Sequence, residues 1–184
     1  MMKSLQDLFE KVNAIDKKRL IVAGANDENV LEAVYQAHRM GVIDVILVGP
    51  KREILAQLKS YKGFAKQISI VDVASKEEAA AVSVAYIKEK KADILMKGLI
   101  DTSILLKAVV NKETGIREKK ILSHVGLVAY PHFDRVLFFT DAAMMIAPSV
   151  DDRLALIDNA LELSKSLGYV KPKVGIVSAV EKVN

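Results

Sequence analysis

Short apolar segments alternate with segments of helical spacing through the first hundred residues, and this alternation constrains the fold more than any other feature. Four apolar runs have the length and composition of buried strands: residues 19–24, 42–48, 68–73 and 92–96. Strands that alternate with helices indicate βαβ units and right-handed crossovers. We therefore expect an α/β fold in which a mostly parallel sheet lies between helices, in three layers.

A polar segment, residues 111–120, interrupts this rhythm and contains a glycine. We interpret it as a boundary between a first α/β domain, residues 1–115, and a second, residues 116–184. Two strands, 121–130 and 135–139, are separated by a loop so short that an antiparallel pair is expected.

The rest of the second domain is predicted to be one helix and one strand. Asp151 or Asp152 is expected to cap the helix, which runs to about Leu167. The strand, residues 173–179, has no evident partner, although a parallel strand normally needs cover on both faces. We therefore expect the second domain to be incomplete.

The composition excludes several classes of function. The 184 residues contain no cysteine, which rules out disulfides, thiolate nucleophiles and cysteine-based metal sites. The three histidines, His38, His124 and His132, lack ligand spacing, so no metal is expected. With 5% aromatic residues and a net charge of +4 spread along the chain, nucleic acid is not an expected partner.

No apolar run has the length of a membrane span, and the first residues lack the apolar core of a signal peptide. We expect a cytoplasmic protein without a membrane partner. The apolar fraction of 51% is high, and part of it is expected to lie at a subunit interface or against a missing piece of the chain. The mild positive charge suits small acidic molecules.

The junction after the fourth strand is the strongest candidate for a site. Lys97 and Gly98 follow the strand, and Thr102 and Ser103 open an apolar helix. Open α/β sheets bind ligands at the carboxyl ends of their strands, and free N–H groups at a helix start attract anions. Lys107 lies four residues after Ser103, on the same helix face. The junction favours a phosphate-bearing substrate.

Each of these residues also has a purely structural interpretation. Lys97 can be a solvated residue at a strand end, Gly98 can serve a turn, and Lys107 can be an exposed helix residue. Thr102 and Ser103 can act only as helix caps.

Three residues beyond the boundary are further candidates with the same ambiguity. His124, beside Ser123, can relay a proton or orient phosphate, but a lone histidine that enters an apolar strand is more often a core residue. Asp141 ends a strand, where it can bind a substrate group or cap a helix.

Three blocks of sequence, taken in order, resemble the phosphate acetyl/butyryltransferase family, in particular its phosphate butyryltransferase branch. The blocks are residues 96–103 with Leu106 and Lys107, residues 122–125, and residues 139–145. The resemblance covers nearly the whole chain, and the opening strand at residues 21–24 belongs to it.

The resemblance implies an enzyme that exchanges a short-chain acyl group, butyryl or similar, between coenzyme A and phosphate. Coenzyme A is then a substrate, and no cofactor is expected. The implied fold is similar to that of isocitrate and isopropylmalate dehydrogenases, with two α/β domains, a site in the cleft between them and assembly into homodimers or larger homo-oligomers. Lys97, Ser123 and His124 are the candidate catalytic residues. Gly98, Thr102, Ser103, Lys107 and Asp141 are the candidate substrate-binding residues.

Family members continue well beyond residue 184, so the chain resembles an N-terminal portion that is weakly active or inactive alone. Two alternatives stay open at this point. One is a non-catalytic module that binds coenzyme A or phosphate or serves assembly, and the other is an acetyl-specific phosphate acyltransferase.

Overall fold

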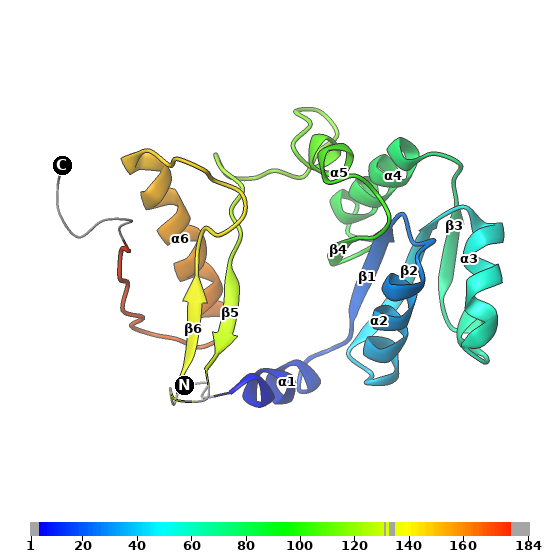
Figure 1. Cartoon of the computed structure of the whole chain (residues 1–184), viewed down its shortest axis with the longest axis horizontal. Coiled ribbons are helices and arrows are strands. Elements are labelled where there is room, and N and C mark those ends of the chain that lie inside the picture. Colours follow the sequence, from blue (N-terminus) through cyan, green and yellow to red (C-terminus); the bar gives the residue numbers. More distant parts are fainter. Residues whose placement is uncertain (1–3, 131, 133–134, 178–184) are drawn as a thin grey trace. The chain divides into compact units, whose positions relative to one another are not determined.

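The computed structural model describes residues 4–130, 132 and 135–177. These residues form two compact units (Figure 1). One unit is Lys11–Glu118, and the other combines the described parts of Met1–Glu10 and Lys119–Asn184. The first helix, α1 (Leu5–Asn13), contributes residues to both units and buries none of them.

The Lys11–Glu118 unit is built around a four-stranded parallel sheet, as the sequence predicts. Its strands are β1 (Lys18–Ala23), β2 (Ile43–Gly49), β3 (Ser69–Asp72) and β4 (Ile94–Lys97). Their order is β3-β2-β1-β4, so the chain moves outward from β1 on one side and then returns to its other side. The carboxyl ends of β1 and β4 therefore flank the point where the strand order reverses, which is where open α/β sheets bind ligands.

Helices cover both faces of this sheet, which confirms the three-layer prediction (Figure 1). The helical segments are α2 (Glu28–Arg39), α3 (Lys51–Gln57), the 3₁₀ turns η1 (Leu58–Ser60) and η2 (Phe64–Lys66), α4 (Lys76–Lys88) and α5 (Thr102–Val109).

Alternation along β1 shows how one strand serves both layers. Leu20 and Val22 pack in the cluster that contains α2 and α3, whereas Ile21 packs in the cluster with α4. Ala23 packs with residues of α4 and α5. A strand buried on both faces reads as a continuous apolar run, which is why the sequence identifies β1 so clearly.

The second unit contains a two-stranded antiparallel sheet and one long helix. Its elements are β5 (Gly126–Ala129), β6 (Val136–Phe139) and α6 (Val150–Ser166). The predicted antiparallel pairing is confirmed. Three of the four predicted loop residues, 131, 133 and 134, lie outside the described residues.

Three local predictions in this unit are wrong. Residues 121–125 are not part of a strand, because side-chain contacts described below replace the ladder there. Ser149, not Asp151 or Asp152, caps α6, and Asp152 completes a capping box from the third helical position. Residues 173–177 form no strand and are mostly exposed, and none of the described residues pairs with them. Residues 178–179 of that predicted strand are not among those described.

None of the helices in the described part of the chain is both long and apolar enough to cross a membrane.

Candidate functional site

Lys97 stands at the carboxyl end of β4, and its ammonium group is directed at the turn that follows. Nζ donates to the carbonyl oxygens of Gly98 at 3.2 Å and of Ile100 at 3.0 Å. An ammonium group carries three N–H donors, so these contacts occupy two of them. The lysine therefore organises the 98–100 turn and still has donor capacity for an anion.

Gly98 allows the turn after β4 to run directly against the turn after β1. Its N–H donates to Ala23 O at 2.9 Å, and a Cβ at this position would lie 2.1 Å from Gly24 O. No side chain fits in that space. The close approach that the sequence suggests for Gly98 is therefore an approach to the protein's own backbone.

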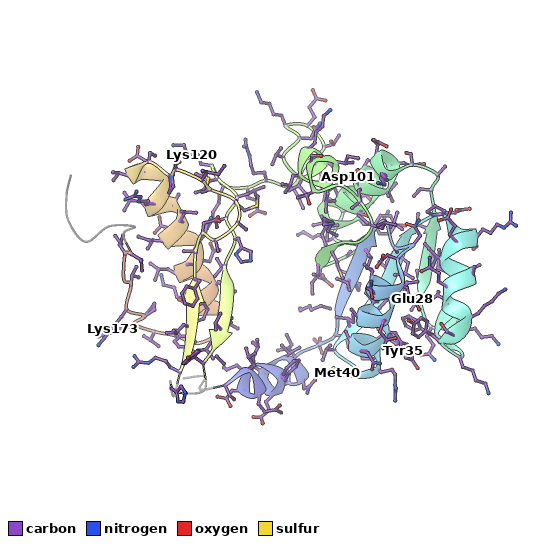
Figure 2. The ribbon with its side chains drawn as sticks, in the orientation of Figure 1. Glu28, Tyr35, Met40, Asp101, Lys120 and Lys173 are labelled. Carbon is purple, nitrogen blue, oxygen red and sulfur yellow. The ribbon has the colours of Figure 1, made fainter. Side chains whose placement is uncertain are left out.

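The start of α5 has an unusual cap. Asp101, labelled in Figure 2, is the N-cap residue, but its side chain makes no capping bond. Its carboxylate pairs instead with Lys76 Nζ at 3.3 Å. Thr102 and Ser103 are the first two helical residues and are exposed. The interpretation of these two as simple helix caps is wrong, since Asp101 holds the cap position.

Lys107 lies in the last turn of α5, where its side chain is exposed. Ser103 and Lys107 share this helix at i and i+4, so they lie on one face, as the spacing predicts. Lys97, Gly98, Thr102, Ser103 and Lys107 thus all belong to one strand–turn–helix segment of the Lys11–Glu118 unit.

The second group of candidates lies in the other unit and is held by hydrogen bonds. Asn159, on α6, donates from Nδ2 to Ser123 Oγ at 2.9 Å. The backbone N–H of His124 donates to Asp141 Oδ2 at 2.9 Å. In the register of β5 and β6, Gly126 pairs with Phe139, and two residues further His124 stands opposite Asp141. The carboxylate takes the place of the backbone ladder there, which explains why the strand begins only at Gly126.

Asp141 uses its other oxygen for the turn after β6. Oδ1 accepts from the N–H groups of Ala143 at 2.7 Å and Met144 at 2.6 Å. Partial burial acts to raise the pKa of Asp141, but the backbone donors of Met144, Ala143 and His124 outweigh it and lower that pKa. Asp141 is therefore a carboxylate near neutral pH. No helix follows it, so the helix-cap interpretation is wrong.

His124 is exposed, so the interpretation as a core histidine is also wrong. Its main chain is fixed by Asp141 while its imidazole remains accessible. Such a side chain is free to contact a bound ligand.

Asn159 is the residue that sequence reasoning missed. An asparagine in the middle of a helical pattern is a weak signal, because it differs from its surroundings only by its lower helix propensity. Among the described residues, no group of three or more histidine or acidic side chains is arranged to hold a metal ion. The chemistry available is cationic and hydroxyl donors in one unit, and a hydroxyl beside an imidazole in the other.

Comparison with known proteins identifies the family. A sequence model described as phosphate acetyl/butaryl transferase matches residues 4–91 and 74–184. The chain is 36% identical over 184 residues to a phosphate butyryltransferase of Clostridium acetobutylicum. That alignment covers 100% of this chain and 61% of the Clostridium protein. It is 35% identical over 180 residues to a phosphate acetyltransferase of Thermotoga maritima, in an alignment that covers 98% of this chain and 60% of the Thermotoga protein.

A solved structure has a similar fold. The crystal structure of a branched-chain phosphotransacylase from Enterococcus faecalis V583 superimposes with a TM-score of 0.76 and 27% identity, covering 91% of this chain and 58% of that one. The chain thus spans about three fifths of the length of the relatives it matches. With matched segments that run from residue 4 to residue 184, this chain belongs to the phosphate acetyl/butyryltransferase family of enzymes.

Proposed function

We propose that the protein containing this chain transfers a butyryl or similar short-chain acyl group between coenzyme A and phosphate. The observation that carries the proposal is the match to phosphate acyltransferases along the whole of this chain, together with the Lys97 turn at the strand-order reversal. Phosphate butyryltransferases and phosphate acetyltransferases both occur among the relatives. That the acyl group is butyryl or of similar length, rather than acetyl, is part of the proposal.

The proposed reaction needs no nucleophile from the protein. A phosphate oxygen attacks the thioester carbonyl, the carbonyl oxygen becomes negative, and the carbon–sulfur bond then breaks. The products are an acyl phosphate and the thiolate of coenzyme A, which takes up a proton. The protein therefore contributes positioning and stabilisation of charge.

We assign these tasks to the candidate residues by their chemistry. The remaining N–H of Lys97 and the hydroxyls of Thr102 and Ser103 attract phosphate oxygens. Lys107 adds a point charge on the same helix face. Gly98 shapes the turn that presents them.

His124 and Ser123 complete the assignment from the other unit. The exposed imidazole of His124 exchanges a proton with phosphate or with the leaving thiolate. Ser123 donates a hydrogen bond to a reacting oxygen. Asp141 serves them by fixing the backbone of His124.

The test is phosphate-dependent release of free thiol from butyryl-CoA by the product of the complete reading frame that contains this chain. Lys97→Met is expected to lower kcat/KM about 10²-fold, because a preorganised charge is lost where negative oxygens bind. The control is Lys91→Met, which removes an exposed lysine that pairs with Glu89. Absence of turnover in the wild type, or an unaffected Lys97→Met enzyme, would contradict the proposal.

Two further measurements separate the alternatives. Calorimetric binding of coenzyme A and phosphate without any turnover would favour a non-catalytic module. A higher kcat/KM with acetyl-CoA than with butyryl-CoA would favour an acetyl-specific enzyme, and each methylene is expected to contribute about 1–3 kcal/mol of discrimination. The 184-residue chain alone is expected to show little or no turnover.

A further inference from the structure

Asn159 occupies a helix position where an apolar residue would be the simpler choice. It lies half-buried in the middle of α6. Leu156 and Leu163, about one helical turn away on either side, are apolar and at least partly buried. Asparagine is a poorer helix former than leucine, and a half-buried amide needs a hydrogen-bond partner. Its partner is the Ser123 hydroxyl, 2.9 Å from Nδ2 and 36 residues away in sequence.

This bond fixes the direction in which Ser123 can act. A serine hydroxyl has one O–H donor and two acceptor lone pairs. Because the amide N–H of Asn159 is directed at a lone pair of Oγ, the proton of the hydroxyl must point elsewhere. Ser123 is thereby prepared to donate a hydrogen bond.

The same arrangement fixes the neighbouring histidine. Asp141 holds the backbone N–H of His124 at 2.9 Å, and Asn159 holds the side chain of the residue before it. The Ser123–His124 pair is therefore anchored to α6 on one side and to the turn after β6 on the other. Two anchors restrict both residues, although residues 121–125 belong to no strand.

We infer that Asn159 is a positioning residue that sets the Ser123 hydroxyl as a donor to an oxygen that becomes negative during acyl transfer. The inference rests on the proposed function. A donor aimed at such an oxygen lowers the barrier only if its direction is fixed beforehand, since reorientation during the reaction would cost free energy. Asn159 supplies that fixed direction without touching the substrate.

The experiment uses the enzyme from the complete reading frame and compares four variants. Asn159→Asp keeps the size of the side chain but replaces the N–H donor with an oxygen, which draws the Ser123 proton toward itself. We expect kcat to fall about tenfold or more with little change in KM, because a hydrogen bond made in the transition state is lost. Ser123→Ala is expected to lower kcat by at least as much.

The decisive readout is the double variant. If Asn159 acts through Ser123, Asn159→Asp causes no further loss of kcat in the Ser123→Ala background. Asp158→Asn is the matched control, since it makes the opposite change at an exposed neighbouring position and is expected to leave kcat unchanged.

The outcomes distinguish the inference from the proposed function. Failure of the wild-type enzyme to turn over butyryl-CoA or acetyl-CoA refutes the proposed function and this inference with it. An active wild type whose Asn159→Asp and Ser123→Ala losses multiply refutes the inference alone. Thermal unfolding checks that each variant is folded, and Asn159→Leu, which adds no charge, replaces Asn159→Asp in the cycle if that variant is not.

Discussion

The two units of this chain differ sharply in how much apolar surface they bury. Of the 23 buried hydrophobic residues in the described part of the chain, 21 lie in the Lys11–Glu118 unit. Only Val136 and Leu156 lie in the other. Conversely, 13 of the 18 large hydrophobic residues that are exposed among those described belong to that second unit.

The difference follows from the number of layers. A four-stranded sheet with helices on both faces encloses three clusters of buried side chains. A two-stranded sheet with one helix has too few strands to enclose a comparable core, and such pairs are only marginally stable by themselves. The Lys11–Glu118 unit is therefore expected to hold most of the stability of this chain.

The largest test of this contrast is a matched pair of leucine truncations. Leu47 is fully buried in β2, whereas Leu154 on α6 is 57% exposed. Leu47→Ala is expected to cost about 2–5 kcal/mol through the cavity it leaves, and Leu154→Ala no more than about 0.5 kcal/mol. Hydrogen exchange measured at increasing denaturant concentration gives the loss of unfolding free energy for each variant. Equal losses would mean that the two units share their stability.

An intermediate effect is expected from a matched pair of glycine substitutions. Gly98→Ala places a Cβ against the backbone of Gly24 and is expected to cost about 1–3 kcal/mol, as overpacking does. Gly175→Ala meets no atom within 4 Å and is expected to be neutral. Thermal unfolding of the two variants measures the difference. A neutral Gly98→Ala would show that the β1 and β4 turns separate easily.

The smallest effect concerns pH and compares one carboxylate from each unit. Arg19 lowers the pKa of Asp93 by side-chain and backbone hydrogen bonds, and backbone donors lower that of Asp141 against the opposing effect of burial. A lowered pKa stabilises the fold above the unfolded value of about 4, and this stability is lost as pH falls further.

Replacement of Asp141 with asparagine is expected to cost about 1–2 kcal/mol at pH 7 through lost charge-assisted hydrogen bonds. Asp93→Asn, at an exposed ion pair, is expected to cost less. Stability measured from pH 7 to pH 2 should show both variants approaching the wild type as the carboxylates protonate. A difference in stability between variant and wild type that does not change with pH would contradict the lowered pKa values of these two carboxylates.

The parts of the fold that sequence predicts best are those in which local and tertiary forces agree. Residues 20–23 of β1 are a continuous apolar run because both faces of the strand are buried. The antiparallel pairing of β5 and β6 follows from the short loop between them. In these places the local sequence pattern favours the same secondary structure as the tertiary packing does.

The sequence fails where a side chain replaces a backbone partner. Residues 121–125 are apolar enough for a strand, but they pair with no neighbouring strand. Asn159 instead donates to the Ser123 hydroxyl, and Asp141 accepts from the backbone N–H of His124. Nothing in the local pattern predicts a contact 36 residues away. The same limit hides the contact between Gly98 and Gly24, since each glycine alone indicates only a turn.

The strand order has a consequence for synthesis of the chain. β1 pairs with β2 through the crossover that contains α2, but its other edge is paired only when β4 has been synthesised, with Leu20 opposite Ile94. Until the ribosome has released β4, a nascent chain exposes one edge of β1, with unpaired N–H and C=O groups along it. Such an edge is a template for aggregation. The segment that bears Lys97 therefore also closes this edge, so impaired docking of β4 should lower the soluble yield as well as the activity.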